Sequence, residues 1–381
     1  MDRYGRALLH LIVGGLASAP SATATQPPSD LGWKLHAEIG MDRGGTSGVF
    51  FSQITTLAFV DDTTFVVADA GEANLRFFTT RGGLLRAVGR KGAGPGEFML
   101  PAVISVDTVV RVFDPQQHRE VVFTRTGDHL ATRRVTATRM MNVTRLHPVS
   151  RHLRVGVTTP LHGSARDQRH FLVFAINDST GILDTLGVYH SGITMWRAQR
   201  GRGGVGLVLT RFGPGGAMGI RDSIVVLADG YSGHVRWLVP SGDTLRLMRE
   251  EVLEAVSRPI SDAEIAATRD QWIDYVAGRG LELSSVEIEP APAWSVAHRV
   301  LVERDGTTWI LVEVGARGGV ERLVLSPALD AERWIVLSPT GRREDFWLSP
   351  GFSLMDVSEE LAAGVYRDSD GVQIVRVYRR R

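Results

Sequence analysis

Residues 89–98 read GRKGAGPGEF, with four glycines, a lysine, a proline and a final phenylalanine. The stretch has two interpretations, a phosphate-binding loop or a linker between structural units. A P-loop requires G-x-x-x-x-G-K-[ST] with its lysine entering a helix. Here Lys91 precedes the glycine cluster, and the residues that follow, MLPAVISVD (99–107), are typical of a strand. The stretch therefore predicts a linker, in which glycines allow positive φ, Pro95 fixes a turn and Phe98 packs beneath the next unit.

Three segments on either side of this linker share one pattern. Residues 65–89, 110–134 and 224–249 each run from a strand through an aspartate, a polar turn, an arginine and a glycine turn to another strand. The matching positions are Asp69, Asp114 and Asp229, then Arg76, Arg119 and Arg236, then Gly82, Gly127 and Gly242. We expect the aspartates to bond turn amides and the arginines to pin neighbouring strands.

The spacing of the repeats indicates the fold. Arg76 and Arg119 are 43 residues apart, and a period of this size built from short strands is typical of a β-propeller blade. The strand runs predict blades at about 50–90, 98–136, 138–190, 203–250, 292–349 and 352–381. The segment 32–40 is predicted to pair with the last blade and close the ring. We therefore predict an all-β, six-bladed propeller, with seven blades as the alternative.

The linker also resembles a known family. VGRKGAGPGEFMLPAVISVD (88–107) resembles the NHL-repeat linker, through Gly94, Pro95, Gly96 and Phe98. DPQQHREVVF (114–123) is similar to the D-x-x-N-x-R motif of these repeats, with glutamine in the asparagine place.

The rest of the chain follows this family less closely. The turn in ADAGEANLRFF (68–78) is two residues longer than the motif, and the later blades lack the full motif. The ending GVYRDSDGVQIVRVYRR (364–380) is similar to closing segments of secreted bacterial six-bladed propellers. The resemblance implies a fold and no single activity, because such propellers include binding modules, lyases, lactonases and hydrolases.

One region breaks the β pattern, and we predict a helical insertion there at about 250–285. In SRPISDAEIAATRDQWIDYVAGRG (257–280), Ser261 and Glu264 form a capping-box sequence, and apolar residues then recur on one helical face. The insertion is interpreted as a packed decoration or, alternatively, as a cap over one mouth of the central channel. Trp272 and Tyr275 are the candidate cap residues.

The N-terminus predicts export. Residues 1–24 contain a basic start, an apolar run and an A-x-A site at 22–24, which is the pattern of a signal peptide. Residues 25–31 are interpreted as a spacer and 32–381 as a single propeller domain in the periplasm or outside the cell. The apolar run is too short to span a bilayer, which takes about 20 residues. The chain has no cysteine, which excludes a lipoprotein anchor, disulfides and thiolate metal sites.

Charge argues against two classes of partner. Cleavage after Ala24 would leave equal numbers of basic and acidic residues. A neutral chain offers no broad electrostatic footprint for nucleic acid or anionic membrane. We predict a monomer whose ligand or protein partner the sequence does not name.

No motif in the sequence assigns chemistry. There is no G-x-S-x-G elbow and no H-E-x-x-H, and DSDG (368–371) lacks the remaining ligands of a calcium loop and is interpreted as a hairpin turn. No catalytic residue, metal ligand or cofactor is predicted.

These observations favour an exported, non-catalytic propeller that binds a ligand or partner protein at one face of the ring. The alternative is a metal-dependent lactonase, esterase or lyase with Ca²⁺ or Zn²⁺ in the central channel. A weaker third hypothesis is a module of an envelope complex. Acidic and histidine side chains converging on the axis would favour the enzyme, whereas an apolar or arginine-lined axis would favour binding.

Overall fold

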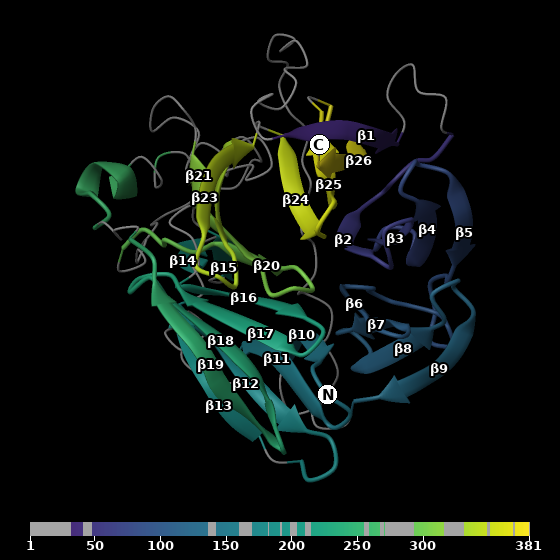
Figure 1. The fold of residues 1–381 in the computed structure, drawn as a ribbon, viewed down its shortest axis with the longest axis horizontal. Helices are drawn as coiled ribbons and strands as arrows, with labels where there is room; N and C mark the ends of the chain where they lie inside the picture. The colour runs from purple at the N-terminus through teal and green to yellow at the C-terminus, as the bar shows by residue number, and fades with distance from the viewer. Residues whose placement is uncertain are drawn as a thin grey trace.

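The ring is visible in the part of the chain that the computed structural model describes, residues 32–40, 48–135, 142–159, 170–181, 183–190, 193–198, 204–209, 215–254, 259–266, 270, 293–315, 331–348, 351–368 and 370–380. These residues form six four-stranded antiparallel sheets and one two-stranded sheet. The six sheets stand as blades around a common axis, in chain order around the ring (Figure 1). The chain is a six-bladed β-propeller, as predicted.

The first three blades each use four consecutive strands, with the first strand nearest the axis (Figure 1). Blade 1 contains β2 (Ile54–Phe59), β3 (Thr64–Asp69), β4 (Asn74–Thr79) and β5 (Leu84–Val88). Blade 2 contains β6 (Val103–Val106), β7 (Val110–Asp114), β8 (Arg119–Phe123) and β9 (His129–Arg134). Blade 3 contains β10 (Asn142–Pro148), β11 (Leu153–Thr159), β12 (His170–Asn177) and β13 (Leu183–His190).

The other three blades follow after a separate hairpin, β14 (Ile193–Ala198) and β15 (Gly204–Leu209). Blade 4 contains β16 (Gly216–Arg221), β17 (Ile224–Asp229), β18 (His234–Ser241) and β19 (Thr244–Val252). Blade 5 contains β20 (Arg299–Val302), β21 (Thr308–Gly315), β22 (Ala331–Leu337) and β23 (Arg343–Leu348). Blade 6 contains β24 (Phe352–Val357), β25 (Leu361–Arg367), β26 (Gln373–Arg380) and β1 (Trp33–Ile39).

Strand β1 closes the ring. It pairs antiparallel with β26, from Trp33 opposite Arg380 to Ile39 opposite Val375. Blade 6 therefore reaches four strands only by combining the two ends of the described chain, which confirms the predicted closure. Closure protects the sheet edges that an open propeller would expose.

The core is divided among the blade junctions. Six apolar clusters occur among the described residues, and each joins two neighbouring blades. At the junction of blades 1 and 2, for example, Phe77 and Phe98 are buried against Val112 and Phe123. A single blade cannot bury both of its faces, so the ring arrangement supplies the missing apolar partner for every sheet.

The two faces of the ring differ in the length of their connections. We call the face where the innermost strands end the turn face, and there every connection within a blade has five residues or fewer, such as 222–223 and 242–243. We call the opposite face, where the innermost strands begin, the loop face. It receives all of the long connections, including 89–102, 191–215 and 253–298. Loops that converge on one face of a rigid ring are the usual place for binding residues.

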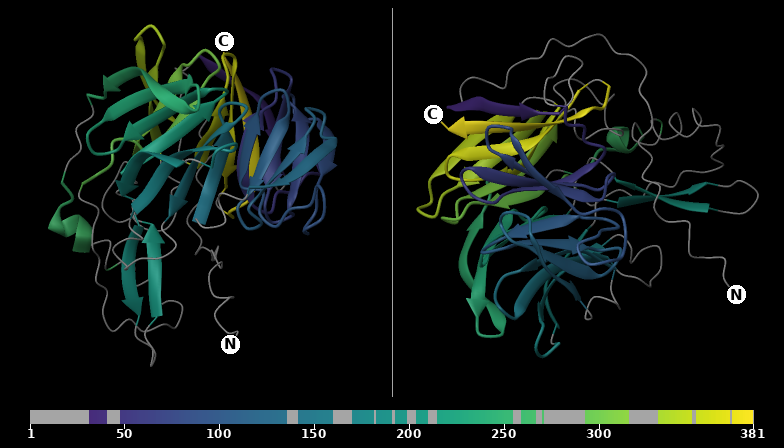
Figure 2. Two further views of the ribbon diagram at one scale, coloured as in Figure 1. Left: turned by 90° about the horizontal axis from the view of Figure 1, so that it is seen from below. Right: turned by 90° about the vertical axis from the view of Figure 1, so that its right-hand side faces the viewer.

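Two described elements stand out from the loop face. The β14–β15 hairpin and a short helix at 262–266 both project on that side of the ring (Figure 2). The helix begins with the predicted capping box, because the Ser261 amide and hydroxyl both donate to Glu264 at 2.9 Å. Strand β19 continues to Val252, close to the predicted start of the insertion.

Several predictions concern residues outside the described ranges. They are the signal peptide at 1–24, the spacer at 25–31 and the candidate cap residues Trp272 and Tyr275. Within the described ranges, no helix is long and apolar enough to cross a membrane.

Candidate functional site

The glycine-rich linker binds itself and its neighbours. The Gly92 amide donates to the Phe98 carbonyl at 2.9 Å, and the Phe98 amide donates to the Arg90 carbonyl at the same distance. The Gly94 amide donates to the carboxylate of Glu97 at 2.7 Å. An ideal Cβ at Gly89, whose φ is +89°, would lie 2.7 Å from the Phe98 ring. These amides and glycines therefore serve packing, and the linker does not offer its amides to a phosphate.

The repeat aspartates of blades 1 and 2 join each blade to the chain segment that enters it. Asp69 and Asp114 are fully buried at the ends of β3 and β7. Each carboxylate accepts amides both from its own turn and from the segment ahead of the innermost strand. The donors are residues 52–53 and 71–72 for Asp69, and residues 99–100 and 116–117 for Asp114. Hydrogen bonds from amides to a buried carboxylate are among the stronger ones in proteins.

The repeat arginines of these blades bind carbonyls of the same segments. Arg119 donates to the carbonyls of Ala93 and Glu97 in the glycine-rich linker. Arg76 donates to the carbonyl of Phe50 at 2.5 Å. Aspartate and arginine together bind both the amides and the carbonyls of the segment that enters the blade.

Blade 4 keeps the two residue types but not these contacts. Asp229 is partly exposed, and its carboxylate accepts amides only from its own turn, Tyr231 at 2.9 Å and Ser232 at 2.7 Å, among the described residues. Arg236 reaches into blade 3, where it donates to the Leu186 carbonyl at 3.1 Å. The pattern in the sequence thus does not distinguish this junction from the other two.

The remaining repeat positions lie in turns. Gly82, Gly127 and Gly242 all have positive φ in the turn between the third and fourth strands of their blades, on the turn face. Gly94, Pro95 and Gly96 lie in the linker on the loop face. These positions are spread around the rim and do not form one site.

An ion pair joins two of the innermost strands at the turn face. Arg221 at the end of β16 lies 3.0 Å from Asp356 at the end of β24, and both side chains are almost buried. Blade 5 lies between these strands, so the pair crosses the end of its innermost strand. Asp356 also accepts the Phe59 amide of blade 1 at 2.7 Å. The carboxylate of Asp356 raises the pKa of Arg221, so the pair stays ionised.

Two further arginines lie along the axis. Arg299 on β20 donates to the Ser353 hydroxyl at 2.9 Å and to the Leu354 carbonyl at 2.7 Å. Arg145 on β10 has access to solvent but makes no hydrogen bond or ion pair with any part of the chain that the structure describes. Burial within the ring and the charge of Arg299 lower the pKa of Arg145. Arg145 belongs to blade 3 and Arg299 to blade 5, with blade 4 between them, and the two charges are close enough to repel each other.

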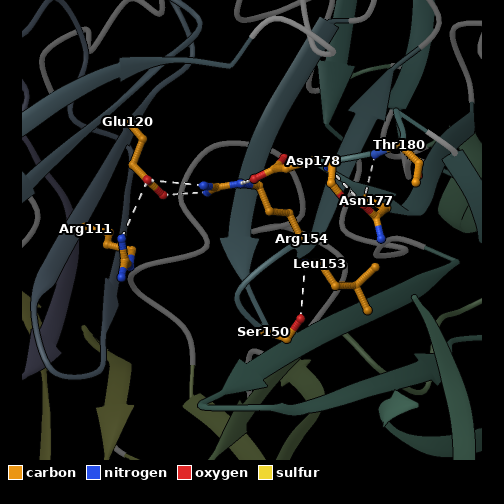
Figure 3. Close-up of polar contacts among 9 residues, drawn as sticks. Arg111, Glu120, Ser150, Leu153, Arg154, Asn177, Asp178 and Thr180 are labelled. Carbon is orange, nitrogen blue, oxygen red and sulfur yellow. Dashed lines mark hydrogen bonds and ion pairs between the residues drawn. The ribbon is translucent and has the colours of Figure 1, made fainter. Parts of the chain in front are cut away.

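The unpaired state of Arg145 contrasts with another arginine of the same blade. Figure 3 shows Arg154 held between Glu120 of blade 2, at 2.6 Å, and Asp178 in the β12–β13 turn, at 2.5 Å. Burial lowers the pKa of Arg154, but the two carboxylates outweigh it and raise the pKa overall. Arg154 is a clamp between blades, whereas the Arg145 guanidinium has no carboxylate partner.

A serine and a histidine meet beside Arg145. Ser105 Oγ of blade 2 lies 2.9 Å from His147 Nδ1. Burial and the charge of Arg145 lower the pKa of His147 to about 4, so the ring is neutral near pH 7. Efficient general bases have pKa values near the working pH, and no carboxylate in the described chain hydrogen-bonds to this ring. The pair is therefore suited to hydrogen bonding more than to proton abstraction.

In the described part of the chain, carboxylates do not gather around the axis in the way a metal site requires. Glu332 lies near Arg299 and is buried, and burial raises the pKa of its carboxyl, while the charge of Arg299 partly offsets the effect. Among the residues with described positions, no group of three or more histidine, aspartate and glutamate side chains is placed to hold a metal ion.

Sequence reasoning did not find the axial residues. Arg145, Arg221, Arg299 and Asp356 each stand alone within a different strand, and none belongs to a repeat motif. The available signal is a charged residue within a short, apolar strand, which predicts an unusual environment but not its partner.

Comparisons with known proteins agree with the architecture. A family model described as DUF5128, a 6-bladed beta-propeller, matches residues 46–143, which cover blades 1 and 2 and the start of blade 3. No curated protein matches the chain.

Solved structures share the general shape at low sequence identity. One is a candidate exported protein from Bacteroides fragilis, with 12% identity, coverage of 93% of this chain and 96% of that chain, and a TM-score of 0.49. Another is a DUF4221 family member from Bacteroides vulgatus, with 9% identity, 91% and 98% coverage and a TM-score of 0.45. A third is a catalytically inactive virginiamycin B lyase from Staphylococcus aureus with quinupristin, with 10% identity, 91% and 99% coverage and a TM-score of 0.41.

Proposed function

We propose that this protein is an exported, non-catalytic binding propeller, and that its ligand enters the axis from the loop face and presents an anionic group to Arg145. The observation that carries the proposal is the Arg145 guanidinium, which belongs to the innermost strand of blade 3, is exposed to solvent and has no carboxylate partner in the described chain. A guanidinium that is free of carboxylates is well suited to pair with an anionic group of a ligand. A carboxylate or phosphate group of a ligand would supply the missing partner.

The two faces of the ring support the direction of approach. At the turn face Arg221 and Asp356 already pair with each other, and Asp356 also accepts the Phe59 amide. The loop face carries the long connections. A ligand that approaches from the loop face meets the segments that vary in length and then the innermost strands.

The charges at the axis favour an anion. Arg145 and Arg299 are both cationic, and their mutual repulsion contributes to the lowered pKa of Arg145. Glu332 offsets only one of these charges. Ser105 and the neutral His147 ring add uncharged hydrogen-bonding groups beside Arg145. This composition is suited to binding and orienting an anionic group.

The test compares two arginine variants in solution. Acetate, malonate and phosphate are titrated at constant ionic strength into wild type, Arg145→Gln and Arg246→Gln, with chloride as the reference, and the thermal unfolding midpoint is recorded. Arg246 is an exposed residue of the outermost strand of blade 4 and is the matched control. At least one anion is expected to raise the midpoint of wild type and Arg246→Gln, because ligands that bind the native state stabilise it.

The same increase should be absent in Arg145→Gln. The proposal is wrong if none of the three anions stabilises wild type more than chloride does, or if Arg145→Gln keeps the full increase. Far-ultraviolet circular dichroism of each variant verifies that the ring is intact.

Export has its own test. The full chain is expressed in a Gram-negative host, and the periplasmic fraction is analysed by intact mass. We expect a product that begins at Thr25, because the A-x-A site ends at Ala24. A product that stays in the cytoplasm with its first 24 residues attached contradicts export.

A further inference from the structure

The junction between blades 3 and 4 contains an aspartate with unused hydrogen-bonding capacity. In blades 1 and 2 the equivalent carboxylates accept amides from the segment ahead of the innermost strand. Here the Gly215 amide, directly ahead of β16, donates to the His190 carbonyl at 2.7 Å instead. Asp229 Oδ1 accepts the two turn amides, and Oδ2 accepts no hydrogen bond from the described residues. One carboxylate oxygen is thus left for another donor.

Three aromatic rings lie beside this carboxylate. The His170 and His190 rings are 5.6 Å apart, and the His190 and Tyr231 rings are 6.5 Å apart. His170 begins β12, His190 ends β13 and Tyr231 lies in the β17–β18 turn, so all three stand at the loop face. His170 is exposed, and the other two rings are partly exposed. Together they form a short row of rings that solvent can reach.

The backbone is shaped to hold these rings in place. An ideal Cβ at Gly215 would lie 2.8 Å from the Tyr231 ring and 2.9 Å from the backbone nitrogen of His190. Only glycine at this position lets Tyr231 lie directly against the chain that enters blade 4. A ring that is fixed before binding loses little conformational entropy when a ligand stacks on it.

Tyr231 also carries a hydroxyl without a partner in the described chain. Its oxygen is buried. Burial and the charge of Asp229 raise the pKa of this hydroxyl to about 12, so it remains a donor at physiological pH. An unmade hydrogen bond at a buried polar group destabilises the fold, so a ligand that supplies the missing partner is favoured. The junction therefore holds one unused acceptor and one unused donor close together.

The local charge selects between ligand classes. Aromatic rings with a carboxylate could hold an organic cation. However, Arg236 lies in the same group, since its charge and that of Asp229 both act on Tyr189. The positive and negative charges offset each other, so a neutral ligand is favoured. A neutral molecule with an apolar face and several hydroxyls matches this arrangement.

We propose that Asp229, Tyr231 and His190 form a binding site for a neutral sugar ring. The C–H face of the sugar stacks on the rings, its hydroxyls donate to Asp229 Oδ2, and a hydroxyl oxygen that reaches between the rings accepts from Tyr231. This site lies at a blade junction on the loop face and is separate from the axial anion site, so neither proposal depends on the other.

The probes are methyl α-glucoside, methyl β-galactoside and N-acetylglucosamine, with choline as the cationic competitor. Binding is followed by saturation-transfer NMR and isothermal titration calorimetry. At least one sugar is expected to bind the wild-type chain. Asp229→Asn and Tyr231→Ala should each weaken that sugar at least tenfold, the effect of losing about 1.4 kcal/mol. Tyr231→Phe should weaken it less, because the ring remains.

Two controls keep the test specific. Asp62→Asn makes the same change at an exposed aspartate on the turn face and should leave sugar binding unchanged. Arg145→Gln should also leave it unchanged, which separates this site from the axis. The proposal is overturned if no sugar binds, if choline binds in preference, or if sugar binding survives in Asp229→Asn and Tyr231→Ala while their unfolding midpoints match wild type.

Discussion

The junction between blades 1 and 2 and the junction between blades 3 and 4 contain the same aspartate and arginine in two different states of hydrogen bonding. At the first junction, buried Asp114 and Arg119 bind the amides and carbonyls of the glycine-rich linker. At the second junction, Asp229 is partly exposed and Arg236 binds blade 3 instead. In the place of a linker stands the β14–β15 hairpin.

The difference shows that a repeat motif can persist after its structural contacts have changed. Where the linker is present, both carboxylate oxygens of the aspartate and both terminal nitrogens of the arginine make hydrogen bonds within the fold. Where the linker is replaced, polar capacity is left over at a solvent-accessible position, and such departures from internal consistency tend to mark functional sites. The following predictions test whether the first junction is structural and the second is not.

Removing the apolar anchor of the first junction should have the largest effect. Phe98 is fully buried and its ring lies 6.0 Å from that of Phe123. Phe98→Ala is expected to lower the free energy of unfolding by about 3–5 kcal/mol, through lost burial and the cavity left behind. Urea unfolding measures the change, and Phe98→Leu, which keeps most of the volume, should cost less than half as much.

The second prediction compares the two aspartates directly. Asp114→Ala leaves four amides without their buried acceptor and should lower the free energy of unfolding by about 3 kcal/mol. Asp229→Ala removes bonds to two turn amides at a partly exposed position and should cost less than about 1 kcal/mol. If urea unfolding shows that both variants lose the same free energy of unfolding, the two junctions do not differ as we infer.

Lowering the pH should destabilise blades 3 and 5 before it destabilises blades 1 and 2. Burial lowers the pKa of His147 in blade 3, together with the charge of Arg145, and that of His298 just ahead of β20, in both cases from 6.5 to about 4. Below pH 6.5 both histidines bind protons in the unfolded chain, whereas in the folded chain they bind protons only near pH 4. The histidine contribution to the free energy of unfolding is therefore fully present above pH 6.5 and falls as the pH drops toward 4, by about 3 kcal/mol per histidine.

Hydrogen exchange at stepwise lower pH locates this loss. Amides of blades 3 and 5 should lose protection while those of blades 1 and 2 keep it. Loss of protection at the same pH all around the ring would mean that the two regions respond as one unit. Replacing both histidines with glutamine should remove the difference between pH 6.5 and pH 4.

The fold was predictable from sequence where local chemistry repeats. Blades 1 and 2 carry the full motif, and strands with alternating apolar residues indicated the others, so the number of blades and the closing role of 32–40 were correct. The outermost strand of blade 4, TLRLMREEV, is mostly polar and exposed, and exposed outer strands give a weak apolar signal.

The candidate sites were less accessible to sequence reasoning. The Arg221–Asp356 pair joins residues 135 positions apart, and no local pattern indicates such a contact. Arg145 is notable for a missing partner, which only the folded ring shows. Asp229 and Arg236 were found as residues, but their altered contacts depend on where the Gly215 amide points.

The pairing of β1 with β26 also fixes an order of events. Glu38 and Arg376 lie 2.6 Å apart although 338 positions separate them in the chain. The seam of blade 6 can form only after its last strand has been synthesised, and contacts between such distant segments form slowly during folding. Until then β1 has no partner within its own blade, so closure of the ring is the last step in assembling blade 6.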